Sequence, residues 1–268
     1  MRSIKLLSFD EYKDRYSSAR IRREDGILEV TVHTEGNSLR WTEQSHHELG
    51  MVFKCIAADR DNRVVVITGV GEEWSGPPAG WEARVHKTPP TPDEWDDIIY
   101  FGRQLEMNML EIEVPVVFAL NGSPHHHAQL PLLADIVIAS EDVVFGDRGH
   151  FAGASLVPGD GINVVFSALL GPNRARYMQL MGYDIDAKKA LQLGLVGEVL
   201  PREQVLERAW QIARQLAEKP DLVLRYTRLV FTQPLKESLL RYQGLGLALE
   251  GLAAIGGSGK GSKGKQQF

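Results

Sequence analysis

The chain lacks several features that would place it in other classes of protein. Its 268 residues include a single cysteine, Cys55, which excludes an internal disulfide bond. No apolar run approaches the length of a membrane-spanning helix, and the first residues contain no signal-peptide core. The net charge of -5 excludes a broad basic surface for nucleic acid. These absences predict a cytoplasmic protein that binds neither a membrane nor a nucleic acid.

Several catalytic and cofactor-binding signatures are also missing. No Gly-x-Ser-x-Gly motif is present, which argues against a serine hydrolase of the α/β-hydrolase type. The Gly69-Val70-Gly71 segment follows a predicted strand but lacks the third glycine of a dinucleotide-binding loop. The Gly-rich tail contains Lys260, but no Ser or Thr follows it, as a phosphate-binding loop requires. These motifs therefore give no support for a dinucleotide site, a phosphate-binding loop or a serine nucleophile.

The predicted elements are rich in strands first and rich in helices last. Apolar and β-branched runs predict strands at residues 27–34, 64–68, 115–120, 136–140 and 143–145. Helical periodicity predicts helices at residues 42–58, 93–112, 162–170, 173–181, 186–193, 202–218, 220–231 and 235–254. The Gly- and Pro-rich segment 69–92 is predicted to be a long loop. This order predicts an α/β core over 1–200, a helical region over 201–255 and a flexible Gly/Ser/Lys tail over 256–268.

Three consecutive histidines, His125, His126 and His127, stand between a predicted strand and an apolar run. Ligands of α/β folds bind where strands end, and imidazole is the side chain whose charge changes near neutral pH. An extended segment would send His126 away from the other two, and zinc sites favour ligands that are spaced along the chain. We therefore expect catalysis rather than metal binding here, with His127 pointing inward.

Four further polar residues stand where chemistry is plausible. His46 shares a face of its predicted helix with apolar residues. It is either a catalytic residue or a core histidine that is hydrogen-bonded to a carbonyl. His150 lies in segment 146–151, which has no helical or strand pattern, and functional residues are common in such irregular segments. Asp160 lies at the start of a predicted helix. It can cap that helix, orient an imidazole, or do both. In a long apolar stretch, Glu250 is the only charged residue, and burial would raise its pKa toward neutrality.

Several motifs together resemble the crotonase (enoyl-CoA hydratase/isomerase) superfamily over roughly residues 20–250. They are Leu120-Asn121-Gly122, the strand entry at 134–139, Val157-Pro158-Gly159-x-Gly161, and Ala187-x-x-Ala190-x-x-x-Gly194-Leu195-Val196 followed by Glu198-Val199. The resemblance implies an α/β fold made of a spiral of ββα repeats, with a helical C-terminal oligomerisation region. It also implies assembly as a homotrimer or a dimer of trimers.

The sequence departs from that superfamily where a CoA thioester would be activated. Crotonases usually carry a Gly-Gly-Gly run that supplies half of a main-chain oxyanion hole, and here the run is 125–127. The catalytic glutamate of hydratases appears as Gln129, and the second carboxylate falls close to His150. The other half of the hole aligns with Gly76-Pro77-Pro78-Ala79, and proline has no N–H to donate. The usual thioester machinery is therefore predicted to be lost.

One branch of the superfamily fits these departures. Segments 31–36, 41–42 and 157–161 are similar to those of 6-oxocamphor hydrolase and related β-diketone hydrolases. The resemblance implies that water cleaves a C–C bond of a small cyclic or bicyclic 1,3-diketone in a retro-Claisen reaction, without CoA or a metal. The residues that carry over to catalytic positions are His46, His127, His150, Asp160 and Glu250. Substrate-binding positions are Trp41, Trp81 and Phe151, of which the last two would serve equally as ordinary core aromatics.

The expected roles follow from the charge that this reaction moves. Because the main-chain oxyanion hole is predicted to be lost, side-chain N–H groups must stabilise the oxyanion, and those of His127 and Trp41 are the candidates. Two pairs of residues are candidates for proton transfer: His150 oriented by Asp160, and His46 with Glu250. One pair would activate the water and the other would protonate the enolate, and the sequence leaves open which does which. Two alternatives stay open: a CoA-thioester hydratase, isomerase or hydrolase with a relocated hole, and an inactive crotonase-fold protein that acts through its oligomer surface.

Overall fold

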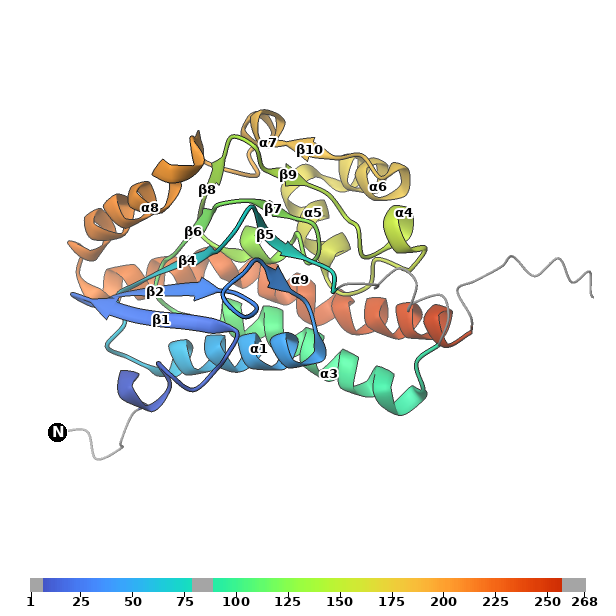
Figure 1. The fold of residues 1–268 in the computed structure, drawn as a ribbon, viewed down its shortest axis with the longest axis horizontal. Helices are drawn as coiled ribbons and strands as arrows, with labels where there is room; N and C mark the ends of the chain where they lie inside the picture. Colours follow the sequence, from blue (N-terminus) through green and yellow to red (C-terminus); the bar gives the residue numbers. More distant parts are fainter. Residues whose placement is uncertain (1–6, 79–88, 257–268) are drawn as a thin grey trace, which may run out of the picture.

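A six-stranded sheet forms the centre of the fold in the computed structural model, which describes residues 7–78 and 89–256 (Figure 1). The strand order is β1-β2-β4-β6-β8-β11. The first two strands form an antiparallel hairpin, and all later neighbours pair in parallel. The strands are β1 (Ala19–Glu24), β2 (Ile27–Val32), β4 (Val64–Gly69), β6 (Val116–Leu120), β8 (Ile136–Ser140) and β11 (Glu198–Leu200).

Helices cover both faces of this sheet, which explains why its strands are almost wholly apolar. Alternate residues of β4 point to opposite faces: Val64 and Val66 pack against α8 (Arg202–Ala217), whereas Val65 and Ile67 belong to the larger core. That core also holds buried residues of α1 (Glu43–Ala58) and α3 (Pro92–Leu110). Figure 1 shows α8 on one side of the sheet and α1 with α3 on the other.

A small parallel sheet beside the main one carries the segments that lead into the site. It consists of β3 (Leu39–Arg40), β5 (Glu73–Gly76) and β7 (Ser123–Pro124). The chain enters α1 just after β3, and the histidine run follows β7 directly. Segment 69–92 was predicted to be a loop, and β5 corrects this. Its few residues show no strand periodicity and are fixed by pairing with segments far away in the sequence.

The remaining elements are short, apart from the last helix. They are the 3-10 helices η1 (Phe9–Glu11) and η2 (Leu130–Leu133), the antiparallel strands β9 (Val144–Phe145) and β10 (Ile185–Asp186), and the helices α4 (Phe151–Ala154), α5 (Ile162–Leu170), α6 (Pro172–Met181) and α7 (Ala187–Leu193). These bounds agree with the helices predicted at 162–170, 173–181 and 186–193. The strands at 19–24 and 198–200 were not predicted, because neither has a distinct apolar pattern.

One continuous helix, α9 (Asp221–Ile255), replaces the two helices predicted at 220–231 and 235–254. The prediction was wrong because it took Pro234 as a break. A proline inside a helix removes the hydrogen bond to the carbonyl four residues earlier, here that of Val230. Val230 is 71% exposed, so this carbonyl lies at the solvent side of the helix. The opposite side of α9 packs on α3 and α5, and this packing maintains the helix through the proline.

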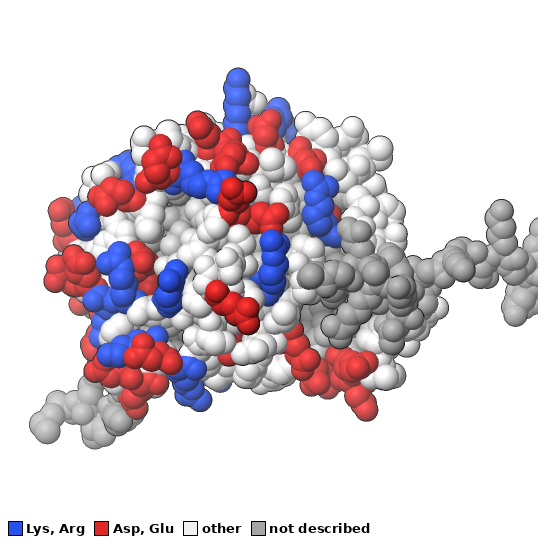
Figure 2. Space-filling model, in the orientation of Figure 1, with Lys and Arg blue, Asp and Glu red and all other residues white. Residues whose placement is uncertain are grey.

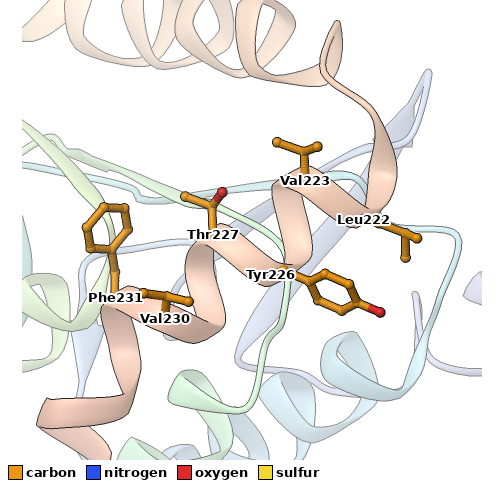
Figure 3. A pocket seen from close by; sticks show the side chains of 6 residues that line it. All are labelled: Leu222, Val223, Tyr226, Thr227, Val230 and Phe231. Carbon is orange, nitrogen blue, oxygen red and sulfur yellow. The ribbon is translucent and has the colours of Figure 1, made fainter.

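The outer face of α9 exposes a row of apolar side chains. A groove of about 530 Å³ runs along its first turns and is lined by Leu222, Val223, Tyr226, Thr227, Val230 and Phe231 (Figure 3). Phe231 and Val230 are each more than two thirds exposed. Apolar surface of this extent is unusual for an isolated monomer. The groove lies far from the histidines in the sequence and contains none of the predicted site residues.

Charges of both signs are interspersed over the face of the molecule shown in Figure 2, and no broad basic patch is visible there. Within residues 7–78 and 89–256, none of the helices combines the length and the apolar character needed to cross a bilayer. Segment 257–268, predicted to be a flexible tail, lies outside the described residues, while Gly256 ends α9.

Candidate active site

The five residues predicted to be catalytic come from five separate parts of the chain and converge on one buried group. The first turn of α1 supplies His46, and the turn after β7 supplies His127, whose backbone adopts a left-handed φ of 53°. The start of α4 supplies His150, the approach to α5 supplies Asp160, and the last turns of α9 supply Glu250. All except the half-buried His46 are less than one tenth exposed.

A chain of hydrogen bonds runs from α1 to Asp160 through two imidazoles. His46 Nδ1 lies 2.7 Å from the carbonyl oxygen of Thr42, and its Nε2 lies 2.7 Å from His127 Nε2. On the other side of the His127 ring, Nδ1 lies 3.0 Å from Asp160 Oδ2. A carbonyl and a carboxylate only accept, so both Nδ1 atoms carry hydrogen. One further proton must then lie between the two Nε2 atoms.

That proton belongs to His127, because burial and the neighbouring charge of His127 lower the pKa of His46 to about 3. At neutral pH, His46 is an uncharged acceptor. The Nε2 of His127 therefore donates to His46, and its Nδ1 pairs with Asp160, so both ring nitrogens of His127 have a partner. This arrangement differs from the predicted pairing of His46 with Glu250.

A second group of side chains surrounds His150. Its Nδ1 lies 2.8 Å from Asp147 Oδ1, while its Nε2 lies 3.7 Å from both Asp160 Oδ2 and Glu250 Oε1. The backbone N–H groups of Gly149 and His150 also donate to Asp147 Oδ1. The sequence predicted that Asp160 orients this imidazole. The structure corrects this: Asp147 fixes the ring, and Asp160 faces its other nitrogen, beyond direct hydrogen-bond distance.

Burial and charge together set the protonation states of this second group. Burial favours the neutral form of His150, but the charges of Asp160 and Asp147 outweigh it and raise its pKa well above the ordinary value. Asp160 is also buried, yet the charged His150 and the hydrogen bond from His127 hold its pKa well below the usual range. For Glu250, burial dominates and raises the pKa to about 8, despite the nearby His150.

Main-chain contact between two glycines fixes the position of Glu250. A Cβ atom at Gly159 would stand 2.2 Å from the carbonyl oxygen of Gly246, and one at Gly246 would stand 2.3 Å from the oxygen of Gly159. Helix α9 therefore touches the loop before α5 backbone to backbone. One turn further along α9, Glu250 Oε2 accepts a hydrogen bond of 3.2 Å from the Gly159 N–H. Glu250 thus approaches the His150 of its own chain.

Comparison with known proteins gives this arrangement its context. The family model for enoyl-CoA hydratase/isomerase matches residues 22–249. The chain belongs to this family. Its fold is accordingly the crotonase α/β fold that the sequence motifs predicted, with a helical C-terminal region.

Curated relatives in this crotonase family act on CoA compounds by name. The 1,2-epoxyphenylacetyl-CoA isomerase of Escherichia coli is 27% identical over 74% of this chain and 75% of its own length. Carnitinyl-CoA dehydratase of Escherichia coli K12 is 26% identical over 77% of each chain.

Solved structures include a relative with higher identity. A β-diketone hydrolase from the cyanobacterium Anabaena sp. PCC 7120, bound to (S)-3-oxocyclohexyl acetic acid, is 42% identical, with a TM-score of 0.85. The match covers 92% of this chain and 97% of that one. An enoyl-CoA hydratase/isomerase from Mycobacterium paratuberculosis shares the fold at 24% identity and a TM-score of 0.81, over 90% and 95% of the two chains.

Trp41 was predicted to bind substrate and to donate its indole N–H to the oxyanion, but the structure gives this N–H another partner. Its indole Nε1–H donates to the carbonyl oxygen of His126 at 3.1 Å, and the hydroxyl of Ser75 donates to the same oxygen at 2.8 Å. The indole N–H is therefore committed, and its predicted role as an oxyanion donor is corrected. The ring of Trp41 instead packs against His46 and His127, with centroid distances of 4.8 and 4.6 Å. Trp41 thereby holds both imidazoles in place.

Of the other two predicted substrate-binding residues, the structure describes Phe151. Phe151 opens α4 and is 50% exposed, so it is not part of the described core. Trp81 lies outside the described residues.

Sequence reasoning missed two acidic residues of this site. Asp147, three residues before His150, had a detectable signal, since this spacing in an irregular segment places a carboxylate beside the ring. Glu106 on α3 is 1% exposed, and its Oε1 accepts from Gln129 Nε2 at 2.8 Å. The same amide nitrogen lies 3.0 Å from Asp160 Oδ2. Burial and the charge of Asp160 raise the pKa of Glu106 well above its usual value, so Asp160 carries the negative charge.

Replacing Asp147 with Asn should change the pH dependence of the reaction. An amide retains the oxygen that accepts from the backbone N–H groups, but it removes a charge that raises the pKa of His150. We expect the alkaline limit of kcat to move down by about one pH unit or more. Asp184→Asn is the matched control, because Asp184 pairs with Arg148 outside the site. Identical pH profiles for Asp147→Asn and wild type would contradict this role for Asp147.

Proposed function

We propose that this crotonase hydrolyses a C–C bond of a cyclic or bicyclic 1,3-diketone to give a keto acid. The observation that carries the proposal is the buried group of Glu250, His150 and Asp160, in which a carboxyl and an imidazole stand 3.7 Å apart with matched protonation. The 42% identity with a β-diketone hydrolase supports the same conclusion, and that protein was solved with a bound keto acid.

The first step is attack by water on one carbonyl carbon. The ionised form of Glu250 takes a proton from the water while a C–O bond forms and the carbonyl becomes an oxyanion. A pKa of about 8 makes this carboxylate a far stronger base than an ordinary glutamate, with roughly a tenth of it ionised at pH 7. Asp160 is a poor base by comparison, because its pKa lies well below the usual range.

The oxyanion requires positive charge or an N–H donor close by. We assign this role to His127, whose Nε2–H must exchange its contact with the uncharged His46 for the oxyanion while Nδ1–H stays on Asp160. It takes over the task that main-chain amides perform at the glycine run of other crotonases. One donor of this kind is worth on the order of 3 kcal/mol of barrier.

Collapse of the oxyanion then breaks the C–C bond. The carbonyl re-forms as a carboxylic acid, and the electron pair of the broken bond moves into an enolate at the second carbonyl. The protonated His150 donates its Nε2 proton to the enolate carbon, which completes the keto acid. Glu250, protonated in the first step, then returns a proton to His150 across their 3.7 Å separation. Both groups regain their starting states without a metal or an organic cofactor.

A direct comparison of substrate classes tests this function. Purified protein is incubated with small cyclic 1,3-diketones and with enoyl-CoA or other CoA thioesters, and products are identified by mass spectrometry in ¹⁸O-labelled water. We expect one labelled oxygen in the carboxylate of a ring-opened keto acid. Turnover of CoA thioesters, together with no diketone cleavage, would favour the CoA-thioester alternative that the names of the curated relatives suggest.

Removal of metal ions should leave the diketone reaction intact. All groups in the proposed steps are side chains of this chain, so no step needs a Lewis acid. We expect the initial rate after treatment with a strong chelator and desalting to equal or exceed that of untreated protein. A loss of activity that added zinc reverses would show that a metal takes part.

We further propose that the chain assembles as a homotrimer or a dimer of trimers, with the exposed apolar face of α9 inside an interface. The groove along its first turns supports this, since such a surface favours burial against another chain (Figure 3). Light scattering coupled to size-exclusion chromatography measures the mass directly. A monomer at micromolar concentration would contradict the assembly.

A further inference from the structure

Three imidazoles meet at one point beside the proposed reaction centre. We propose that His46, His126 and His127 form a binding site for a divalent transition-metal ion such as Zn²⁺ or Co²⁺. Each of these residues offers one ring nitrogen, and the three nitrogens lie within 4.8 Å of one another. The sequence predicted that adjacent histidines would diverge. The convergence arises because His46 on α1 faces the turn that carries the other two.

The hydrogen bonds behind two of these rings match those of known metal ligands. A metal-bound histidine normally donates its second ring N–H to a carbonyl or a carboxylate, which fixes the tautomer and aims the free nitrogen. His46 Nδ1 lies 2.7 Å from the Thr42 carbonyl oxygen, and His127 Nδ1 lies 3.0 Å from Asp160 Oδ2. Both Nε2 atoms are thereby turned away from these acceptors and toward each other, on the side where His126 also lies.

The Nε2 atoms of His46 and His127 are so close that a proton or a metal ion must lie between them. Two Nε2 atoms 2.7 Å apart, both with hydrogen on the opposite nitrogen, would repel each other through their lone pairs. A proton relieves this repulsion, and so does a metal ion. Zinc–nitrogen bonds of about 2.0–2.1 Å in tetrahedral geometry place the nitrogens about 3.4 Å apart. Binding therefore requires the His46–His127 contact to widen from 2.7 Å and His126 to move closer than its present separation of up to 4.8 Å.

The donor set defines the class of ion. Three imidazoles suit zinc, cobalt, nickel and copper and are poor ligands for magnesium or calcium. The fourth position remains for water. Because the ion would take the electron pair of His127, it would prevent that residue from stabilising an oxyanion. This site would therefore inhibit the proposed reaction rather than support it.

Metal binding is tested without substrate, so its result is independent of the proposed function. The full chain is freed of metal with a chelator, desalted and titrated with Co²⁺, followed by its visible absorption, and with Zn²⁺, followed by calorimetry. We expect one ion per chain for the wild type and Co²⁺ bands typical of a nitrogen-rich tetrahedral site. His126→Ala should bind at least about tenfold more weakly.

Neighbouring histidines provide matched controls for this experiment. His125→Ala changes the adjacent residue on the same turn, and His47→Ala changes an exposed residue next to His46 that packs on Phe101. Both should bind like the wild type. His126→Gln, which retains a polar side chain against Gly149, serves if the alanine variant is unstable. The proposal is overturned if the wild type binds no ion, or if His126→Ala and His126→Gln bind as tightly as it does.

Discussion

Replacing Asp160 with Asn should reduce kcat for a cyclic 1,3-diketone at least a hundredfold. Its carboxylate carries a negative charge and faces two imidazole rings, that of His127 at 3.0 Å and that of His150 at 3.7 Å. An amide of the same size removes this charge, so His150 loses an interaction that keeps it protonated and His127 loses its charged hydrogen-bond acceptor. General acid catalysis contributes about 10²- to 10⁴-fold, and the oxyanion donor would be weakened as well. Steady-state kinetics near neutral pH measure the effect.

His150→Ala should lower kcat to a similar extent, because it removes the proton donor itself. Since Asp160 acts through the two imidazoles, the double variant should be little worse than either single one. Asp142→Asn is a suitable control, since Asp142 is a partly exposed acid that pairs with Arg202 away from the site. Circular dichroism and thermal melting confirm that each variant is folded. Rates close to wild type in both Asp160→Asn and His150→Ala would refute this mechanism.

Replacing Glu250 with Gln should have the second large effect and should also change the response to pH. The proposed base works only when ionised, so below its pKa of about 8 the wild-type rate should rise about tenfold per pH unit and then level off. Glutamine has almost the same shape but never accepts the proton from water. We expect kcat to fall by about a thousandfold and the rise with pH to disappear. Rate profiles between pH 5.5 and 9.5 measure both effects.

A matched control lies on the same helix. Glu237 is an exposed acid of α9 whose hydrogen-bond partner is Gln233, and Glu237→Gln should leave the profile unchanged. A profile for Glu250→Gln that rises through the same pKa as the wild type would assign the base to another residue. The shape of the curve distinguishes a lost base from a general loss of structure, which lowers the rate equally at every pH.

Much of this fold follows from local patterns in the sequence. Thr42 was expected to cap α1, and its side chain does accept a hydrogen bond from the Ser45 N–H. The apolar strand at 64–69 indicated burial on both faces, which helices on either side of the sheet confirm. Tertiary contacts decided the remainder. Strand β5 exists through partners far away in the sequence, and α9 continues past Pro234 because its inner face is packed.

The candidate site was predictable as a set of residues but not as a set of pairs. Residue type and position singled out His150 and Glu250, because ionisable side chains in irregular or apolar segments are uncommon. Which atom faces which depends on distances of a few tenths of an ångström between segments remote in sequence. For this reason Asp147 replaced Asp160 as the residue that orients His150. Glu106 could not be found, because a glutamate on a helix is usually solvated.

The glycine contact between α9 and the loop before α5 ties the position of Glu250 to the main chain of that loop. Gly159 and Gly246 meet main chain to main chain, and the indole of Trp95 packs against Gly251, so these close contacts together set the position of Glu250. Enlarging either glycine by one methyl group would move the helix and the acid together. Both glycines should therefore stay unchanged when this protein is redesigned, because their lack of a side chain sets where Glu250 lies.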